Sequence, residues 1–119
     1  TMMPHLTLEL SKQFPCDDPH ALLTACNQAL FATGVFNAKQ DIKSRLYVAP
    51  YSLIGAGDDG EHFVFAKLQL LSGRDDATKA HLVKTLLETI SGQLGQHATD
   101  VQYAVDIAEL SPFYQKAVL

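Results

Sequence analysis

Residues 3–10 have the sequence MPHLTLEL, in which polar and apolar side chains alternate from His5 to Leu10. Such strict alternation is typical of a β-strand with one buried face, so Leu6, Leu8 and Leu10 are expected to point toward a core. A proline precedes the alternating residues. Because proline lacks an N–H, it is tolerated best where a strand lies at the edge of a sheet. The simplest interpretation of Pro4 is therefore a residue that opens an edge strand.

Pro4 also has a chemical interpretation. If Met3 is the initiator methionine and is removed, the Pro4 nitrogen becomes a secondary amine. Free α-amino groups titrate at about 7.7 to 8.0, and both burial and nearby cations lower that pKa toward the range that suits a general base. Of residues 1–3, Thr1 and Met2 are then left by an expression vector, and Met3 is the initiator. While Met3 is attached, the Pro4 nitrogen is an amide without basicity.

The composition indicates one globular domain, which we place at residues 4–119. The chain has 119 residues, of which 47% are hydrophobic and 18% charged. No apolar run approaches the roughly 20 residues of a membrane span. A net charge of −4 provides no basic surface for nucleic acid. We therefore expect neither a membrane nor a nucleic acid as partner. Two cysteines without a C-x-x-C pair, and no visible signal peptide, favour the cytoplasm.

Two helices are predicted, each preceded by a capping aspartate. The first follows Asp18, since aspartate is a good N-cap and the proline after it fits the first helical position. Gly34 is a typical C-terminal stop for this helix. The second helix begins at Asp75 or Asp76. The apolar stripe that we predict to face the core from the second helix consists of Ala80, Val83, Leu86, Leu87, Ile90 and Leu94.

Three further strands are predicted at residues 44–49, 62–71 and 101–109 from their period-two alternation. The order of elements is β-α-β followed by β-α-β, so residues 4–50 and 62–110 repeat one layout. Right-handed helical crossovers between parallel strands place both helices on one face of a four-stranded sheet. The predicted fold class is therefore α+β. The opposite sheet face combines charged, polar and aromatic side chains, which suggests contact with other subunits.

Two arginines are candidate anion-binding residues. Arg45 opens the second strand on the same face as His5 and Thr7, where a guanidinium can bind a carboxylate bidentately. Arg74 lies in the turn before the second helix, whose N-terminus also favours negative charge. Taken alone, Arg45 is more simply interpreted as a surface arginine at a strand end, and Arg74 as a solvated turn residue or an ion-pair partner for Asp75 or Asp76.

Other classes of site have no motif in the chain. The five histidines show no metal-ligand spacing, so no metal site is expected. The glycines match no nucleotide-binding pattern, and no serine stands in G-x-S-x-G. The lysines are scattered and are interpreted as solvated charges. The aspartate pairs at 17–18 and 75–76 are interpreted as helix caps.

Four short stretches occur together in the chain: Met3-Pro4-His5, Ile42-Lys43-Ser44-Arg45, Leu71-Ser72-Gly73-Arg74 and Ile107-Ala108-Glu109-Leu110-Ser111-Pro112. In combination, and in a duplicated β-α-β chain, they resemble the 5-carboxymethyl-2-hydroxymuconate isomerase family. That family belongs to the tautomerase superfamily, with macrophage migration inhibitory factor and 4-oxalocrotonate tautomerase as relatives. The resemblance covers essentially the whole chain.

The resemblance implies a homotrimer in which three four-stranded sheets form a central barrel. It implies Pro4 as an amino-terminal catalytic base, with Arg45 and Arg74 binding the carboxylates of a small anionic substrate and completing the catalytic set. The implied reaction is a proton shift in an unsaturated 2-hydroxy or 2-oxo di- or tricarboxylate, without metal or organic cofactor. In the family, this step belongs to the breakdown of homoprotocatechuate, an aromatic acid.

Two functions of different kinds remain compatible with the sequence. The first is a cofactor-free isomerase, or tautomerase, that uses Pro4 as a general base. The second is a non-catalytic oligomeric module for small-molecule binding or interaction, for which a free amine at Pro4 is irrelevant. A different proline-based reaction in the same pocket, such as decarboxylation or hydration, is a third interpretation, because a fold does not determine a reaction.

Overall fold

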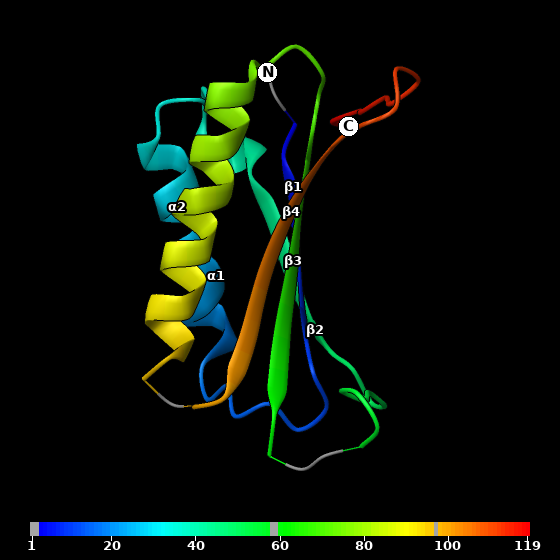
Figure 1. Cartoon of the computed structure of the whole chain (residues 1–119). Coiled ribbons are helices and arrows are strands. Elements are labelled where there is room, and N and C mark those ends of the chain that lie inside the picture. The colour runs from blue at the N-terminus through cyan, green and yellow to red at the C-terminus, as the bar shows by residue number, and fades with distance from the viewer. Residues whose placement is uncertain (1–2, 58–59, 97) are drawn as a thin grey trace.

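The computed structural model describes residues 3–57, 60–96 and 98–119. Figure 1 shows two helices side by side against one sheet. In chain order the elements are β1 (His5–Leu10), α1 (Pro19–Ala32), the short 3-10 helix η1 (Lys39–Asp41), β2 (Lys43–Val48), β3 (His62–Leu70), α2 (Asp76–Leu94) and β4 (Val101–Glu109). The predicted α+β class, with two β-α-β units in succession, is confirmed.

The four strands form one mixed sheet in the order β2-β1-β3-β4. β1 is parallel to β2, β3 is parallel to β4, and β1 is antiparallel to β3. β1 is thus an inner strand, and the prediction that Pro4 opens an edge strand is wrong. Pro4 is tolerated because it stands immediately before the first residue of the strand, where the ladder does not yet require its N–H.

Both helices begin at the predicted caps. The carboxylate of Asp18 accepts a hydrogen bond from the amide of Ala21, and that of Asp75 accepts one from the amide of Thr78. Asp75 is therefore the cap of α2, and Asp76 is its first residue. Gly34 follows α1 with a φ of 78°, a left-handed conformation that glycine adopts without strain. Neither of the two described helices is long and apolar enough to cross a membrane.

The core lies between the sheet and the helices. Leu6, Leu8 and Leu10 are fully buried there, together with Cys26 of α1. The predicted stripe of α2 is partly wrong, because Leu82 is fully buried and Leu87 is 38% exposed. The buried residues of α2 follow a strict spacing of four: Leu82, Leu86, Ile90 and Leu94. Ala80 and Leu87 are apolar but lie on the solvent side of that stripe.

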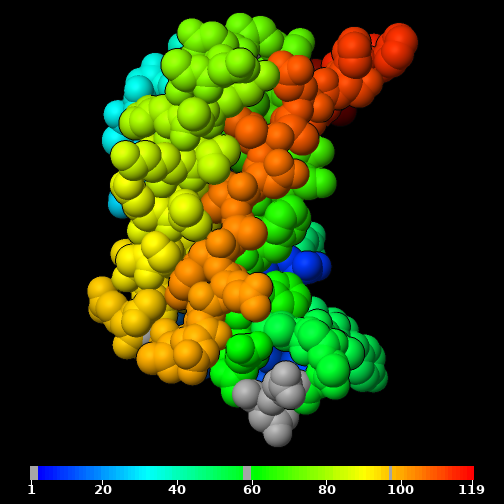
Figure 2. All heavy atoms as spheres, in the orientation of Figure 1, coloured from blue at the N-terminus to red at the C-terminus, as the bar shows by residue number. Residues whose placement is uncertain are grey.

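The opposite face of the sheet has no helix over it. It carries the odd-numbered residues of β1, and the register places Thr7 beside Arg45 and Lys67. Aromatic side chains interrupt these polar residues; Phe65 and Tyr47 are 38% and 59% exposed. After β4, the C-terminal tail (residues 110–119) leaves the body of the molecule, as Figure 2 shows at its upper right.

Candidate active site

One end of the sheet collects the residues that the sequence analysis singled out. Because β1 and β2 start where the antiparallel β3 and β4 finish, Pro4 lies at the same end as Lys43, Leu70 and Glu109. Both chain termini and the loop into α2 lie at this end, which is uppermost in Figure 1. The loop from β3 to α2 and the segment after β4 therefore start at the same end of the sheet as Pro4.

Pro4 is fully buried within the chain. Its carbonyl oxygen accepts a hydrogen bond of 3.2 Å from the amide of Lys43, which anchors the start of β1 to β2. In the chain as printed, Met3 holds the Pro4 nitrogen in a peptide bond. The structure thus places a buried proline among the first residues of two parallel strands.

His5 joins β2 to the C-terminal tail. The Nη2 of Arg45 lies 3.0 Å from Nδ1 of His5, and the Oη of Tyr114 lies 2.9 Å from Nε2. Arg45 pairs in register with Thr7, so its guanidinium reaches two residues back along β1, toward Pro4. This end of the sheet therefore has a continuous set of hydrogen bonds from Arg45 through His5 to Tyr114.

The hydrogen-bond partners of His5 indicate which of its ring nitrogens carries the proton. A guanidinium can only donate, so Nδ1 of His5 must accept and carries no proton. The proton of the neutral ring is then on Nε2, which donates to the Tyr114 hydroxyl. Burial lowers the pKa of His5, and the positive charges of Arg45, Lys43 and Lys116 lower it further. His5 is therefore held as a neutral imidazole.

Lys43 is the cation that the sequence analysis missed. Its side chain lies beside His5 in the register of β1 and β2, on the open sheet face. Its Nζ is buried and has no hydrogen-bond partner among the described residues. Burial lowers the pKa of Lys43, as does the charge of Lys116, whereas Asp41 opposes the change. The signal was its position two residues before Arg45 in the same alternating strand.

Arg74 lies exposed in the loop between β3 and α2. Gly73 before it has a φ of 115°, which turns the chain sharply into the helix. Hydrogen bonds from Thr78 lower the pKa of the Asp75 carboxyl, and the charge of Arg74 adds to this effect. Arg74 and Arg45 thus reach the Pro4 end of the sheet from different elements.

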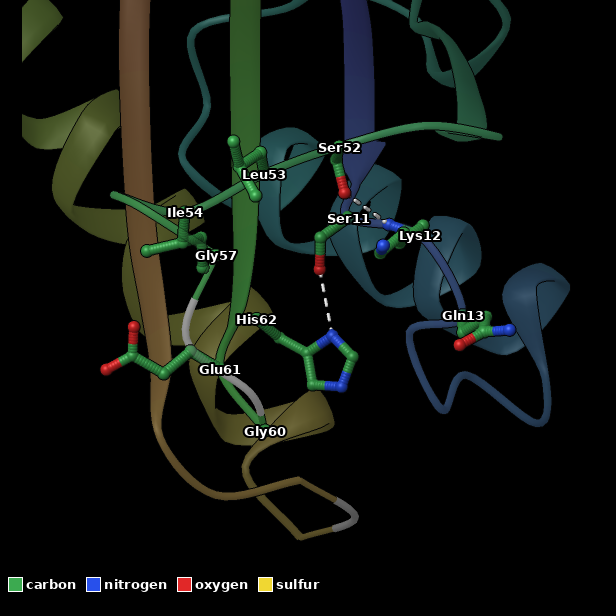
Figure 3. A pocket seen from close by; sticks show the side chains of 10 residues that line it. All are labelled: Ser11, Lys12, Gln13, Ser52, Leu53, Ile54, Gly57, Gly60, Glu61 and His62. Carbon is green, nitrogen blue, oxygen red and sulfur yellow. Dashed lines mark hydrogen bonds between the residues drawn. The ribbon is translucent and has the colours of Figure 1, made fainter.

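A cavity among the described residues lies away from Pro4. It has a volume of about 350 Å³ and opens at the other end of β1, as Figure 3 shows. There the Ser11 hydroxyl lies 2.9 Å from Nδ1 of His62 and accepts a hydrogen bond from the Phe63 amide. These bonds terminate the pairing of β1 with β3. No three His, Cys, Asp or Glu side chains gather to form a metal site among residues 3–57, 60–96 and 98–119.

Comparison with known proteins identifies the family. The family model for 5-carboxymethyl-2-hydroxymuconate isomerase matches residues 4–116, which is nearly the whole chain. The chain belongs to the 5-carboxymethyl-2-hydroxymuconate isomerase family. It is thus a member of an isomerase family, as the sequence resemblance predicted. No curated protein sequence matches the chain.

Solved structures share the fold of this isomerase family member. A 5-carboxymethyl-2-hydroxymuconate isomerase from Deinococcus radiodurans R1 superposes with a TM-score of 0.82 at 24% identity, covering 97% of this chain and 90% of that one. A 5-carboxymethyl-2-hydroxymuconate delta-isomerase gives 0.80 at 20% identity, with 98% and 88% covered. A fused 4-OT symmetric trimer gives 0.66 at 22% identity, with 88% and 85% covered. At these identities, the three structures establish the fold alone.

Proposed function

We propose that this isomerase shifts a proton within an unsaturated 2-hydroxy or 2-oxo di- or tricarboxylate such as 5-carboxymethyl-2-hydroxymuconate. Pro4, once it is the first residue, is the general base. One observation carries the proposal: the Nζ of Lys43 is buried, has no hydrogen-bond partner among the described residues, and belongs to the strand that starts beside Pro4. A buried charge without a partner is costly, and a substrate carboxylate compensates it.

The cations around Pro4 serve the chemistry in two ways. Positive charge nearby disfavours a protonated amine, so we expect the buried position of Pro4 and the cations at this end of the sheet to lower the pKa of a free Pro4 amine below its usual value. The same charges attract an anionic substrate to a protein whose net charge is −4. The basicity of Pro4 and the binding of an anionic substrate thus depend on the same group of cationic side chains.

The proposed reaction needs one proton and no electron transfer. The Pro4 nitrogen removes the proton from the enol hydroxyl, and the negative charge spreads over the dienolate. Arg45 and Arg74, with Lys43, stabilise that charge on oxygen and hold the carboxylates. The ammonium of Pro4 then returns the proton to a distant carbon, which leaves the ketone and regenerates the amine. No metal or organic cofactor takes part in this scheme.

We further propose that three copies assemble around their open sheet faces. The support is the face itself, where Phe65 and Tyr47 are exposed between polar residues, and the likeness to a 4-OT structure that is a symmetric trimer.

Cys16 and Cys26 are both free thiols, which supports a reducing cytoplasm as the location. The step belongs, in this proposal, to the breakdown of an aromatic acid.

The test is a panel of 2-hydroxymuconate-type mono-, di- and tricarboxylates, with protein whose first residue is verified as Pro4 by intact mass. We expect ketonisation of di- or tricarboxylates and weak turnover of monocarboxylates. Replacing Pro4→Ala should lower kcat by about 10²- to 10⁴-fold, the usual contribution of a general base. Full activity of Pro4→Ala contradicts the mechanism. Binding of these acids without any turnover favours a binding module instead.

A further inference from the structure

The C-terminal tail begins at the Pro4 end of the sheet with a defined turn. The amide of Leu110 donates to the carbonyl of Leu70 at 2.7 Å and continues the pairing of β4 with β3. The hydroxyl of Ser111 then accepts from the amide of Phe113 at 3.0 Å, and its carbonyl accepts from that of Tyr114 at 2.9 Å. This turn reverses the chain after Pro112 and brings Tyr114 into contact with His5 at the start of β1.

Two side chains of the tail make contacts at this end. The ring of Tyr114 meets the imidazole of His5 edge to face, with 5.8 Å between their centroids, in addition to the hydrogen bond. The Nζ of Lys116 lies 4.0 Å from a carboxylate oxygen of Asp41. Tyr114 is half-buried, whereas the neighbouring Phe113 is 89% exposed. The tail thus presents Tyr114 to His5 specifically.

We propose that Tyr114 is a positioning residue for the isomerase site: by accepting the Nε2 proton of His5, its hydroxyl stabilises the tautomer whose Nδ1 accepts from, and so fixes, the guanidinium of Arg45. An imidazole with its proton on Nδ1 cannot accept from Arg45, and a protonated imidazole repels it. In this proposal Tyr114 acts through His5 and does not itself contact the reacting atoms. The catalytic consequence rests on the proposed function above, but the tautomer of His5 does not.

The first experiment measures the tautomer directly, in the full chain at neutral pH. Imidazole nitrogen chemical shifts of His5 are compared for wild type, Tyr114→Phe and the control Tyr51→Phe, which removes a hydroxyl that is 91% exposed. Wild type and control should show the Nε2–H form. Tyr114→Phe, which keeps the ring but loses the acceptor, should show a mixture of both forms. An Nδ1–H form in the wild type, or an unchanged Tyr114→Phe spectrum, overturns the proposal.

The second experiment measures the catalytic consequence in protein that begins at Pro4. Tyr114→Phe should lower kcat/KM by about five-fold, mainly through KM, as expected for the loss of one ordered hydrogen bond. Tyr51→Phe should leave both constants unchanged. In a His5→Asn background, which keeps an acceptor near the Nδ1 position but no Nε2, Tyr114→Phe should have no further effect. The same five-fold loss in that background overturns the proposal.

The two experiments separate this inference from the proposed function. If the protein with a free Pro4 converts none of the acids in the panel, the proposed function fails. The nitrogen shifts of His5 then still decide whether Tyr114 sets the tautomer.

Discussion

Arg45 and His5 are joined by a hydrogen bond of 3.0 Å that runs diagonally between β2 and β1. Direct partners in the register are Thr7 for Arg45 and Lys43 for His5. The guanidinium of Arg45 therefore points toward the first residues of β1, so its positive charge lies near that of Lys43. This diagonal brings two cations to the end of the sheet where Pro4 is buried.

We expect the amine of a free Pro4 to titrate below the usual range of about 7.7 to 8.0 for an amino terminus. Burial and the cluster of Lys43, Arg45 and Lys116 both disfavour its protonated form. The measurement is a pH titration of nitrogen-15-labelled proline at position 4, with Lys43→Met as a comparison. The variant should titrate higher than wild type. A wild-type value at or above the usual range contradicts the electrostatic argument.

Lys43→Met should separate stability from function. The substitution removes a buried ammonium that has no hydrogen-bond partner among the described residues, so the free energy of unfolding should rise by about 1 kcal/mol. At the same time, KM for a dicarboxylate should rise by about ten-fold, because a substrate contact is lost. Urea unfolding and steady-state kinetics provide the two readouts. Lys84→Met, on the exposed surface of α2, is the matched control and should change neither. If KM is unchanged in Lys43→Met, Lys43 does not contact the substrate.

The lowered pKa of His5 predicts a pH dependence of folding. The unfolded chain binds a proton near the usual histidine value of about 6.5, whereas folded His5 binds one only at lower pH. Its contribution to stability is therefore present above that value and is lost as the pH falls below it. His5→Gln should weaken the decline in unfolding free energy between about pH 7.5 and 5.5. The charged and titratable groups around His5 are Lys43, Arg45, Tyr114 and Lys116. An unchanged decline in the variant would mean that His5 is not held neutral.

The open sheet face should control assembly. Phe65→Lys on β3 and Leu87→Lys on α2 introduce the same charge at two positions that are each 38% exposed. If trimers form through the sheet faces, Phe65→Lys should dissociate them, since a lysine buried at an interface is unpaired. Leu87→Lys should leave them intact. Analytical ultracentrifugation distinguishes the two results. The opposite outcome, with only Leu87→Lys dissociating the assembly, would place the interface on the helices.

Alternation and capping residues were sufficient to predict most of the fold. Leu6, Leu8 and Leu10 point inward as their period-two pattern required, and Asp18 caps α1. The stripe of α2 was predicted less well, because its surface also carries apolar residues. Both Leu86 and Leu87 fit a helical stripe in the sequence, and only packing against the sheet selects Leu86.

The candidate site was harder to predict, because its contacts join residues that are far apart in the chain. Arg45 was found from its place in an alternating strand, but Lys43 was grouped with solvated lysines although it lies on the same face. Tyr114 gave no signal. Its partner His5 is 109 residues away, and the tail that carries it has no periodicity that predicts where it folds.

The central claim is that the Pro4 nitrogen acts as a base only when it is a free amine. The most direct test compares two preparations of one protein, one beginning at Pro4 and one retaining Met3, each verified by intact mass. Both are assayed for ketonisation of 5-carboxymethyl-2-hydroxymuconate under the same conditions. We predict that the Pro4 preparation turns over the acid and that the Met3 preparation, whose Pro4 nitrogen is an amide, loses at least about 100-fold in kcat. Equal rates in the two preparations would contradict the account.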